Sequence, residues 1–217
     1  MPALSHHTLL HRSVRPAVRL LAATAVTPDQ LTIARLLTGL AAAVAFAIGP
    51  MMLGAGLGLM LVSCLLDRAD GELARQTRRF SRFGGRFDLV ADCVATAAIF
   101  VGLGIGTDAP DWAENRVPLL ASVMPELMGV AAAVGIAAIF SRLNLPGVRD
   151  EARPGEPRRL FDPDDSLLLV LPVIGLGAAW EVLLAAAIVT PVVALSLWGT
   201  WFARGRRRAA LVSCEAD

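Results

Sequence analysis

Residues 67–75 read DRADGELAR and residues 84–92 read GGRFDLVAD, and only eight residues separate the two segments. The segments carry four aspartates between them: Asp67, Asp70, Asp88 and Asp92. The first two are three residues apart and the last two are four apart, so each pair shares one face of a helix. Because the connection is short and basic, we expect the two helices to be direct antiparallel neighbours whose carboxylates converge.

Apolar stretches surround these segments along most of the chain. Of its 217 residues 55% are hydrophobic and its mean hydropathy is +0.60, which is more apolar surface than a soluble core of this size can bury. Six stretches approach membrane length: 31–49, 51–66 (with a polar tail to about 75), 86–106, 118–140, 165–179 and 181–203. The fifth is the weakest, because a proline and two glycines interrupt it. We predict an all-α membrane protein with six transmembrane helices in a single domain over residues 1–217.

Arginine placement predicts the orientation of these helices. Arginines concentrate before the first span, in residues 75–86, in residues 142–159 and in residues 204–208, whereas residues 107–117 on the other side contain only Arg116. By the positive-inside rule both termini are cytoplasmic. We expect a multi-pass protein of the bacterial inner membrane, with an uncleaved N-terminal amphipathic interfacial helix over about 8–26.

The four aspartates indicate a metal site. Carboxylates that face one another repel strongly unless cations lie between them or some are protonated. Hard oxygen ligands favour Mg²⁺, Mn²⁺ or Ca²⁺, and no His or Cys is placed to favour zinc. Divalent ions surrounded by arginines can bind the oxygens of a pyrophosphate. The alternative is that these are helix-end carboxylates paired with neighbouring arginines, which would account for one or two of the four.

The two segments together resemble the signature of the CDP-alcohol phosphotransferase family, D-x2-D-G-x2-A-R-x8-G-x3-D-x3-D. All of its fixed positions are filled, by Asp67, Asp70, Gly71, Ala74, Arg75, Gly84, Asp88 and Asp92. The resemblance extends to the six-span layout and to the segment TPDQLT at residues 27–32. It implies a bundle with a cytoplasm-facing polar cavity and a site for two ions, Mg²⁺ or Mn²⁺.

The resemblance also implies roles for individual residues. The first ion is expected on Asp67, Asp70 and Asp88, and the second on Asp67, Asp88 and Asp92, with Asp92 as the general base. The residues expected to bind the CDP-linked donor are Asp29, Gln30, Leu31, Thr32, Gly71, Ala74, Arg75, Ser81 and Gly84. An acceptor hydroxyl would take the phosphoalcohol group from a CDP-linked lipid or alcohol and release CMP, as in phospholipid biosynthesis. Membrane lipid is an expected partner and nucleic acid is not, while a homodimer is left open.

The acceptor is the least defined part of this interpretation. Ser141 and Arg142 end the fourth span on the cytoplasmic side and are candidates for an acceptor phosphate, although a plain interfacial anchor explains them equally well. Family members that use phosphorylated acceptors often place Lys or Arg directly after the last aspartate, and this chain has Cys93 there, which argues against a phosphorylated acceptor. The string GELAR at residues 71–75 looks like inositol-phosphate-using members. Glu126 is expected to be buried within the fourth span.

The distribution of polar residues and the intact set of aspartates argue against two other classes of function. A cation transporter or channel would distribute polar residues through the depth of the bilayer, whereas here they cluster at one end of the spans. A non-catalytic assembly subunit has no need for four costly carboxylates. The transferase is therefore the preferred interpretation.

Overall fold

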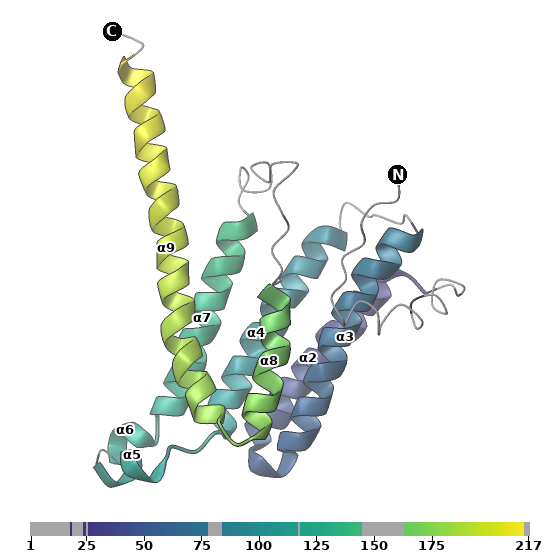
Figure 1. Cartoon of the computed structure of the whole chain (residues 1–217), viewed down its shortest axis with the longest axis vertical. Helices are drawn as coiled ribbons and strands as arrows, with labels where there is room; N and C mark the ends of the chain where they lie inside the picture. Colours follow the sequence, from purple (N-terminus) through teal and green to yellow (C-terminus); the bar gives the residue numbers. More distant parts are fainter. Residues whose placement is uncertain are drawn as a thin grey trace.

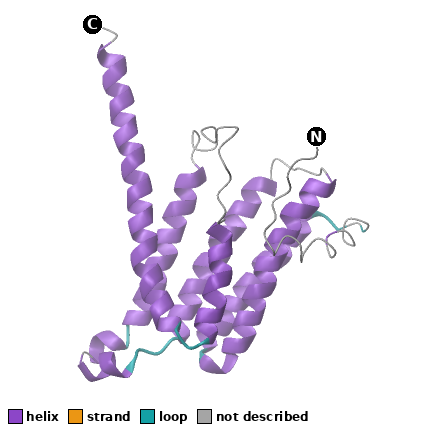
Figure 2. Ribbon diagram, in the orientation of Figure 1, coloured by secondary structure: helices purple, strands orange, loops and turns teal. Residues whose placement is uncertain are grey.

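A computed structural model describes residues 18, 24, 26–77, 84–116, 118–144 and 163–214. All regular structure within these ranges is helical, which confirms the all-α prediction (Figure 2). The amphipathic helix expected over residues 8–26 lies almost entirely outside the described residues.

The helices and their bounds are α2 (Pro28–Ile48), η1 (Pro50–Met52), α3 (Leu53–Thr77), α4 (Gly84–Gly106), α5 (Asp111–Arg116), α6 (Pro118–Ala121), α7 (Met124–Asn144), α8 (Pro163–Gly175) and α9 (Ala179–Cys214). The long helices and α8 run alternately up and down, while α5 and α6 lie across one end (Figure 1). The start of α2, the end of α3, the start of α4 and the end of α7 therefore lie toward the same end of the bundle. We call this the signature end.

Within the described ranges five helices, α2, α3, α4, α7 and α9, are long and apolar enough to cross a membrane. The expected fifth span is shorter than predicted, because α8 has 13 residues and covers only about 20 Å at 1.5 Å per residue. The expected fourth span begins later, at Met124, because residues 118–121 form the separate short helix α6. The last helix is longer than predicted and continues to Cys214.

The expected direct packing of α3 against α4 is wrong. Among the described residues, α2 packs closely against both α3 and α4, and these two helices make almost no contact with each other. Small residues allow this approach: a Cβ atom added at Gly39 would lie 2.8 Å from the side chain of Ala95, and one added at Gly102 would overlap the backbone of Ala43. The first helix of the bundle is thus inserted between the two helices that carry the aspartates.

Beyond α4 the packing continues through α7 to α9, while α8 contacts α3 and α9. Large apolar side chains such as Phe46, Met60, Ile99 and Leu183 form the main core. The charged side chains that are buried within the described residues are Arg35, Arg68, Asp70 and Arg142. All four belong to the half of their helix nearer the signature end, which argues against a polar pathway through the bilayer.

Candidate metal centre

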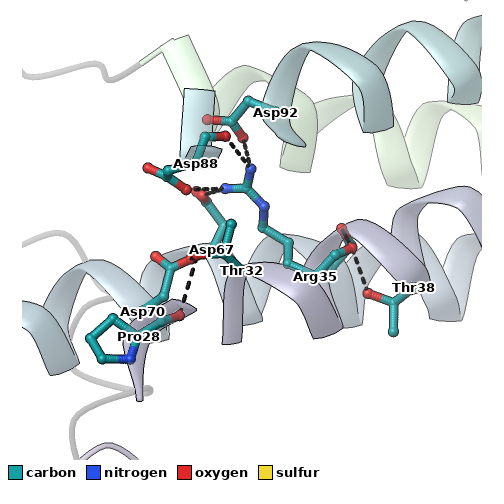
Figure 3. A network of polar contacts seen from close by, with 9 residues as sticks. Pro28, Thr32, Arg35, Thr38, Asp67, Asp70, Asp88 and Asp92 are labelled. Carbon is teal, nitrogen blue, oxygen red and sulfur yellow. Dashed lines mark hydrogen bonds and ion pairs between the residues drawn. The ribbon is translucent and has the colours of Figure 1, made fainter. Parts of the chain in front are cut away.

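Three helices bring polar side chains together at the signature end (Figure 3). The first, α2, begins with a capping box in which the Thr27 hydroxyl accepts a hydrogen bond from the Gln30 amide (3.3 Å) and the Gln30 side chain accepts one from the Thr27 amide (3.0 Å). This cap fixes the first turn, and the next turn directs Thr32 and Arg35 toward α3 and α4, because they are three residues apart on one face.

The four aspartates predicted from the sequence do gather at one place. Carboxylate oxygens of Asp67 and Asp70 on α3 and of Asp88 on α4 lie within 4.8 Å of one another. Asp92, one turn beyond Asp88, joins them through the guanidinium of Arg35. We refer to these four residues as the acid cluster. Because α3 and α4 barely touch, their aspartates meet beside α2, which packs against both helices.

Arg35 lies at the centre of the acid cluster and was missed by the sequence analysis. Its side chain is 2% exposed, and its Nη1 donates to Asp67 Oδ1 and lies 3.2 Å from Asp88 Oδ1. Its Nη2 lies 2.7 Å from Asp92 Oδ1 and donates to the backbone carbonyl of Asp88 across 3.0 Å. The signal was present in the sequence, because an arginine inside an apolar span is costly unless anionic groups surround it.

Asp70 is held by a different neighbour. The Thr32 hydroxyl donates to Asp70 Oδ2 across 3.0 Å, and both residues are buried. Behind them, the Ser63 hydroxyl donates to the backbone carbonyl of Arg35 across 3.0 Å, which fastens α2 to α3. Thr32 and Arg35 of α2 thus contact all four members of the acid cluster between them. The hydrogen bond from Ser63 fixes the backbone of α2 at Arg35.

Thr32 is the one residue expected to bind the donor that has a described contact with the acid cluster. On α2, Asp29 is exposed and Gln30 caps the helix, while Leu31 packs in a small apolar group with Ala69 and Leu73. On α3, Gly71 and Ala74 are half-buried, and Gly84 begins α4. Ser81 lies outside the described residues, as does the side chain of Arg75.

The two acceptor candidates differ from each other. Ser141 is exposed, and its hydroxyl donates to the carbonyl of Ala137 on its own helix across 2.6 Å. Arg142 is 8% exposed, and its guanidinium carbon lies 5.5 Å from the centre of the Trp201 ring on α9. Within the described part of the chain, its Nε and Nη1 are buried and have no hydrogen-bond partner. No described contact joins either residue to the acid cluster.

The expectation that Glu126 is buried within the fourth span is wrong. Glu126 is exposed in the first turn of α7 and not buried within a span. A negative charge is favourable there because the first turn of a helix carries a partial positive charge. The acidic residue therefore has a local structural explanation.

The helical bundle and its acid cluster define a polytopic helical protein with a carboxylate-rich site at one end of its spans. Residues 25–151 match the CDP-alcohol phosphatidyltransferase family, so the chain belongs to this family. The match covers more than half of the chain and includes every residue of the acid cluster.

Known relatives and a solved structure extend this result. The chain is 40% identical over 86 residues to archaetidylinositol phosphate synthase of Pyrococcus horikoshii (40% of this chain, 45% of the relative). It is 30% identical over 149 residues to the bifunctional IPC transferase and DIPP synthase of Thermococcus kodakarensis (65% and 34%). The alignments thus span less than half of either relative. The fold resembles that of phosphatidylinositol phosphate synthase from Mycobacterium tuberculosis, solved with CDP-DAG bound (TM-score 0.56, 23% identity, 86% of this chain and 94% of that one).

The acid cluster fits a divalent cation on the chemistry of its donors. Three carboxylate oxygens lie close enough together to be bridged by an ion, and Mg²⁺ and Mn²⁺ prefer oxygen donors at about 2.0–2.2 Å. Asp67, Asp88 and Asp92 share the guanidinium of Arg35, and Asp70 accepts from the uncharged Thr32 hydroxyl. Within this set of described contacts negative charge exceeds positive charge, and a cation would offset it. An aspartate triad from two helices is therefore available for an ion.

Proposed function

We propose that this chain is an integral-membrane CDP-alcohol phosphotransferase. It transfers a phosphoalcohol group, of phosphatidyl type, from a CDP-linked donor to a hydroxyl acceptor and releases CMP in phospholipid biosynthesis. The observation that carries the proposal is the meeting of all four signature aspartates at one end of a helical bundle that belongs to this family. The single domain spans residues 1–217.

The acid cluster holds two ions, Mg²⁺ or Mn²⁺. Asp67, Asp70 and Asp88 hold the first, and Asp67, Asp88 and Asp92 hold the second. When bound, the ions supply charge neutralisation on the pyrophosphate oxygens and lower the pKa of a bound hydroxyl. Oxygens of the first set lie within 4.8 Å of one another, which supports this assignment.

Asp92 is the general base of the reaction. Its carboxylate accepts the proton of the acceptor hydroxyl as that oxygen forms a bond to the phosphorus distal to cytidine. The bond from this phosphorus to the bridging oxygen breaks, and CMP leaves with the bond electrons. The Asp92 side chain is 34% exposed, which gives it access to an incoming hydroxyl. Positioning and charge stabilisation supply most of the rate.

The donor lies over the signature residues of α3 and the start of α4. Gly71, Ala74 and Gly84 leave room for a nucleotide against the backbone, and Arg75 and Ser81 supply polar contacts. We assign Asp29, which is exposed in the first turn of α2, to the same donor site. The structure of the mycobacterial synthase has CDP-DAG bound, and we assign a CDP-linked lipid of this kind as the donor here.

The acceptor carries a phosphate, and the product is of the inositol-phosphate type. Arg142 supports this, because a buried guanidinium with two nitrogens that lack hydrogen-bond partners among the described residues is suited to an anion. The names of two similar proteins also include an inositol phosphate product. Arg142 then binds the acceptor phosphate, and Ser141 borders it.

The chain crosses the bacterial inner membrane six times with both termini in the cytoplasm. The alternation of α2, α3, α4, α7, α8 and α9 supports this, because α8 must return the chain between α7 and α9. In both α3 and α9, only 17% of the most apolar 18-residue stretch is buried inside the protein. The rest of each stretch leaves apolar surface for lipid.

CMP release tests the proposal. Purified chain is supplied with CDP-diacylglycerol and Mg²⁺ and then with inositol phosphate, glycerol phosphate, inositol or serine, and Asp67→Asn serves as the inactive control. We expect rapid CMP release with a phosphorylated acceptor alone. Release with an unphosphorylated acceptor would overturn the acceptor assignment, and no release above the Asp67→Asn control with any acceptor would overturn the donor or the activity.

A further inference from the structure

The contacts of Arg35 divide the acid cluster into two groups. Its guanidinium reaches three of the four carboxylates, those of Asp67, Asp88 and Asp92. The fourth, Asp70, instead accepts a hydrogen bond from a threonine on α2. The three acids around Arg35 are the set assigned above to the second ion. The set assigned to the first ion differs by the exchange of Asp92 for Asp70.

We propose that Arg35 is the built-in counter-cation of the second ion position and competes with the divalent ion for it. This inference rests on the proposed function, from which it takes the two ion assignments. It predicts that the two ions bind with unequal affinity. The first is coordinated beside Arg35, and the second binds only as the guanidinium withdraws from the carboxylates.

Competition follows from the geometry of the shared oxygens. Asp92 Oδ1 lies 2.7 Å from Arg35 Nη2. The guanidinium therefore already occupies the side of this oxygen that faces the other carboxylates. A divalent ion needs the same oxygens at about 2.0–2.2 Å, which would place two like charges side by side in a region of low dielectric. Either the guanidinium moves or the second ion binds weakly.

Displacement of the guanidinium would involve the Arg35 side chain alone, because its helix is held in place. The backbone of α2 is fixed there, because Ser63 donates to the carbonyl of Arg35 and Thr32 holds Asp70. The long side chain has several rotatable bonds, and in the metal-free cluster Arg35 neutralises carboxylates that would otherwise repel. Arg35 is thus a positioning residue for the acids before the ions bind.

The test measures metal binding without turnover. Free Mn²⁺ is counted by electron paramagnetic resonance during titration of the purified full-length chain at about pH 8, where protons compete little for carboxylates. Wild type is compared with Arg35→Gln, which removes the charge, and with Arg35→Lys, which keeps it. Arg116→Gln is the matched control, because Arg116 is exposed on α5 at the opposite end of the bundle.

We expect wild type to bind one Mn²⁺ tightly and a second at least about tenfold more weakly. Arg35→Gln should tighten the second ion by about tenfold, while Arg35→Lys and Arg116→Gln stay near wild type. The metal-free Arg35→Gln protein should also have a lower melting temperature than metal-free wild type. Saturating Mn²⁺ should make this difference in melting temperature smaller. Two equally tight ions in wild type, or a second ion that Arg35→Gln binds no more tightly, would overturn the inference.

A second measurement keeps the inference falsifiable if Arg35→Gln does not fold. The side-chain ¹⁵N signal of Arg35, assigned by its loss in Arg35→Lys, is followed during a Mg²⁺ titration of wild type. It should move mainly as the second ion binds, and a signal that stays still through that phase would contradict displacement. A wild-type chain that binds no Mn²⁺ and releases no CMP would instead overturn the proposed function, and this inference with it.

Discussion

The Thr32 hydroxyl of α2 donates a hydrogen bond to Asp70 Oδ2 of α3 across 3.0 Å, and both side chains are buried. The family resemblance assigned Thr32 to the donor. The structure shows its hydroxyl facing the acid cluster, where it orients a carboxylate. Partners of this kind hold a metal ligand in place without touching the metal, and metal affinity depends on them.

Thr32→Val should weaken metal binding while it keeps the shape of the side chain. Loss of an orienting hydrogen bond typically costs about 10–100-fold in metal affinity or activity. We expect a Mn²⁺ dissociation constant raised by that factor and a parallel fall in CMP release at limiting metal. Mn²⁺ titration and CMP assays on the same preparation check this.

Thr38→Val is the matched control for Thr32→Val. The Thr38 hydroxyl donates only within its own helix, to the carbonyls of Ala34 and Arg35 at 2.9 Å each. This variant should keep wild-type metal affinity. If Thr32→Val kept its metal affinity and lost affinity for the CDP-linked donor, Thr32 would be a donor contact, as the family resemblance implied.

Asp92→Asn should separate catalysis from binding. Asp92 is assigned as base and as ligand to one ion only, so the Asp92→Asn protein should still bind the donor and the first ion. Loss of a general base typically costs about 10²–10⁴-fold in rate. Asp67→Asn should abolish metal binding together with turnover, because Asp67 is assigned to both ions.

Donor affinity and CMP release, measured side by side for both variants, check this separation. If Asp92→Asn released CMP at nearly the wild-type rate, Asp92 would be a structural carboxylate. The proton acceptor would then have to be another group.

Arg142→Gln should raise the KM for a phosphorylated acceptor and leave the affinity for the CDP-linked donor unchanged. Hydrogen bonds to a charged group contribute about 1.5–3 kcal/mol, so an increase of about 10–100-fold is expected. Ser141→Ala should raise this KM less than Arg142→Gln does, because the exposed Ser141 hydroxyl already donates to its own helix. An unchanged KM in Arg142→Gln would make Arg142 a packing residue against Trp201.

Gly102→Ala should loosen the contact between α2 and α4. A Cβ atom there would overlap the backbone of Ala43, and overpacking of this kind typically costs about 1–3 kcal/mol. Gly58→Ala is the control, because no described atom lies within 4 Å of the added Cβ. Thermal unfolding in detergent compares the two, and equal stability would mean that α2 is not held against α4 at this point.

The sequence predicted the acid cluster because helical spacing alone fixes which aspartates share a face. Asp67 with Asp70 and Asp88 with Asp92 needed no knowledge of the fold. Their meeting required only that the two segments lie at the same end of their helices. The short connection between them ensured that, even though the helices are not direct neighbours.

The central position of α2 could not be predicted from sequence order. Helices that follow each other along the chain usually pack together, and this favoured α3 against α4. The close approach of α2 depends on which small residues face one another, such as Gly39 and Ala95, and this is a property of the packed bundle. Arg35 was missed for the same reason, although its charge inside an apolar span was a usable signal.

The most direct test of the account is CMP release by metal-stripped protein. Purified chain is treated with excess chelator and supplied with CDP-diacylglycerol and a phosphorylated acceptor, and then Mn²⁺ or Mg²⁺ is added back. We expect no release above background before the metal is restored, and recovery that follows metal occupancy of the acid cluster. Full turnover in excess chelator would contradict it.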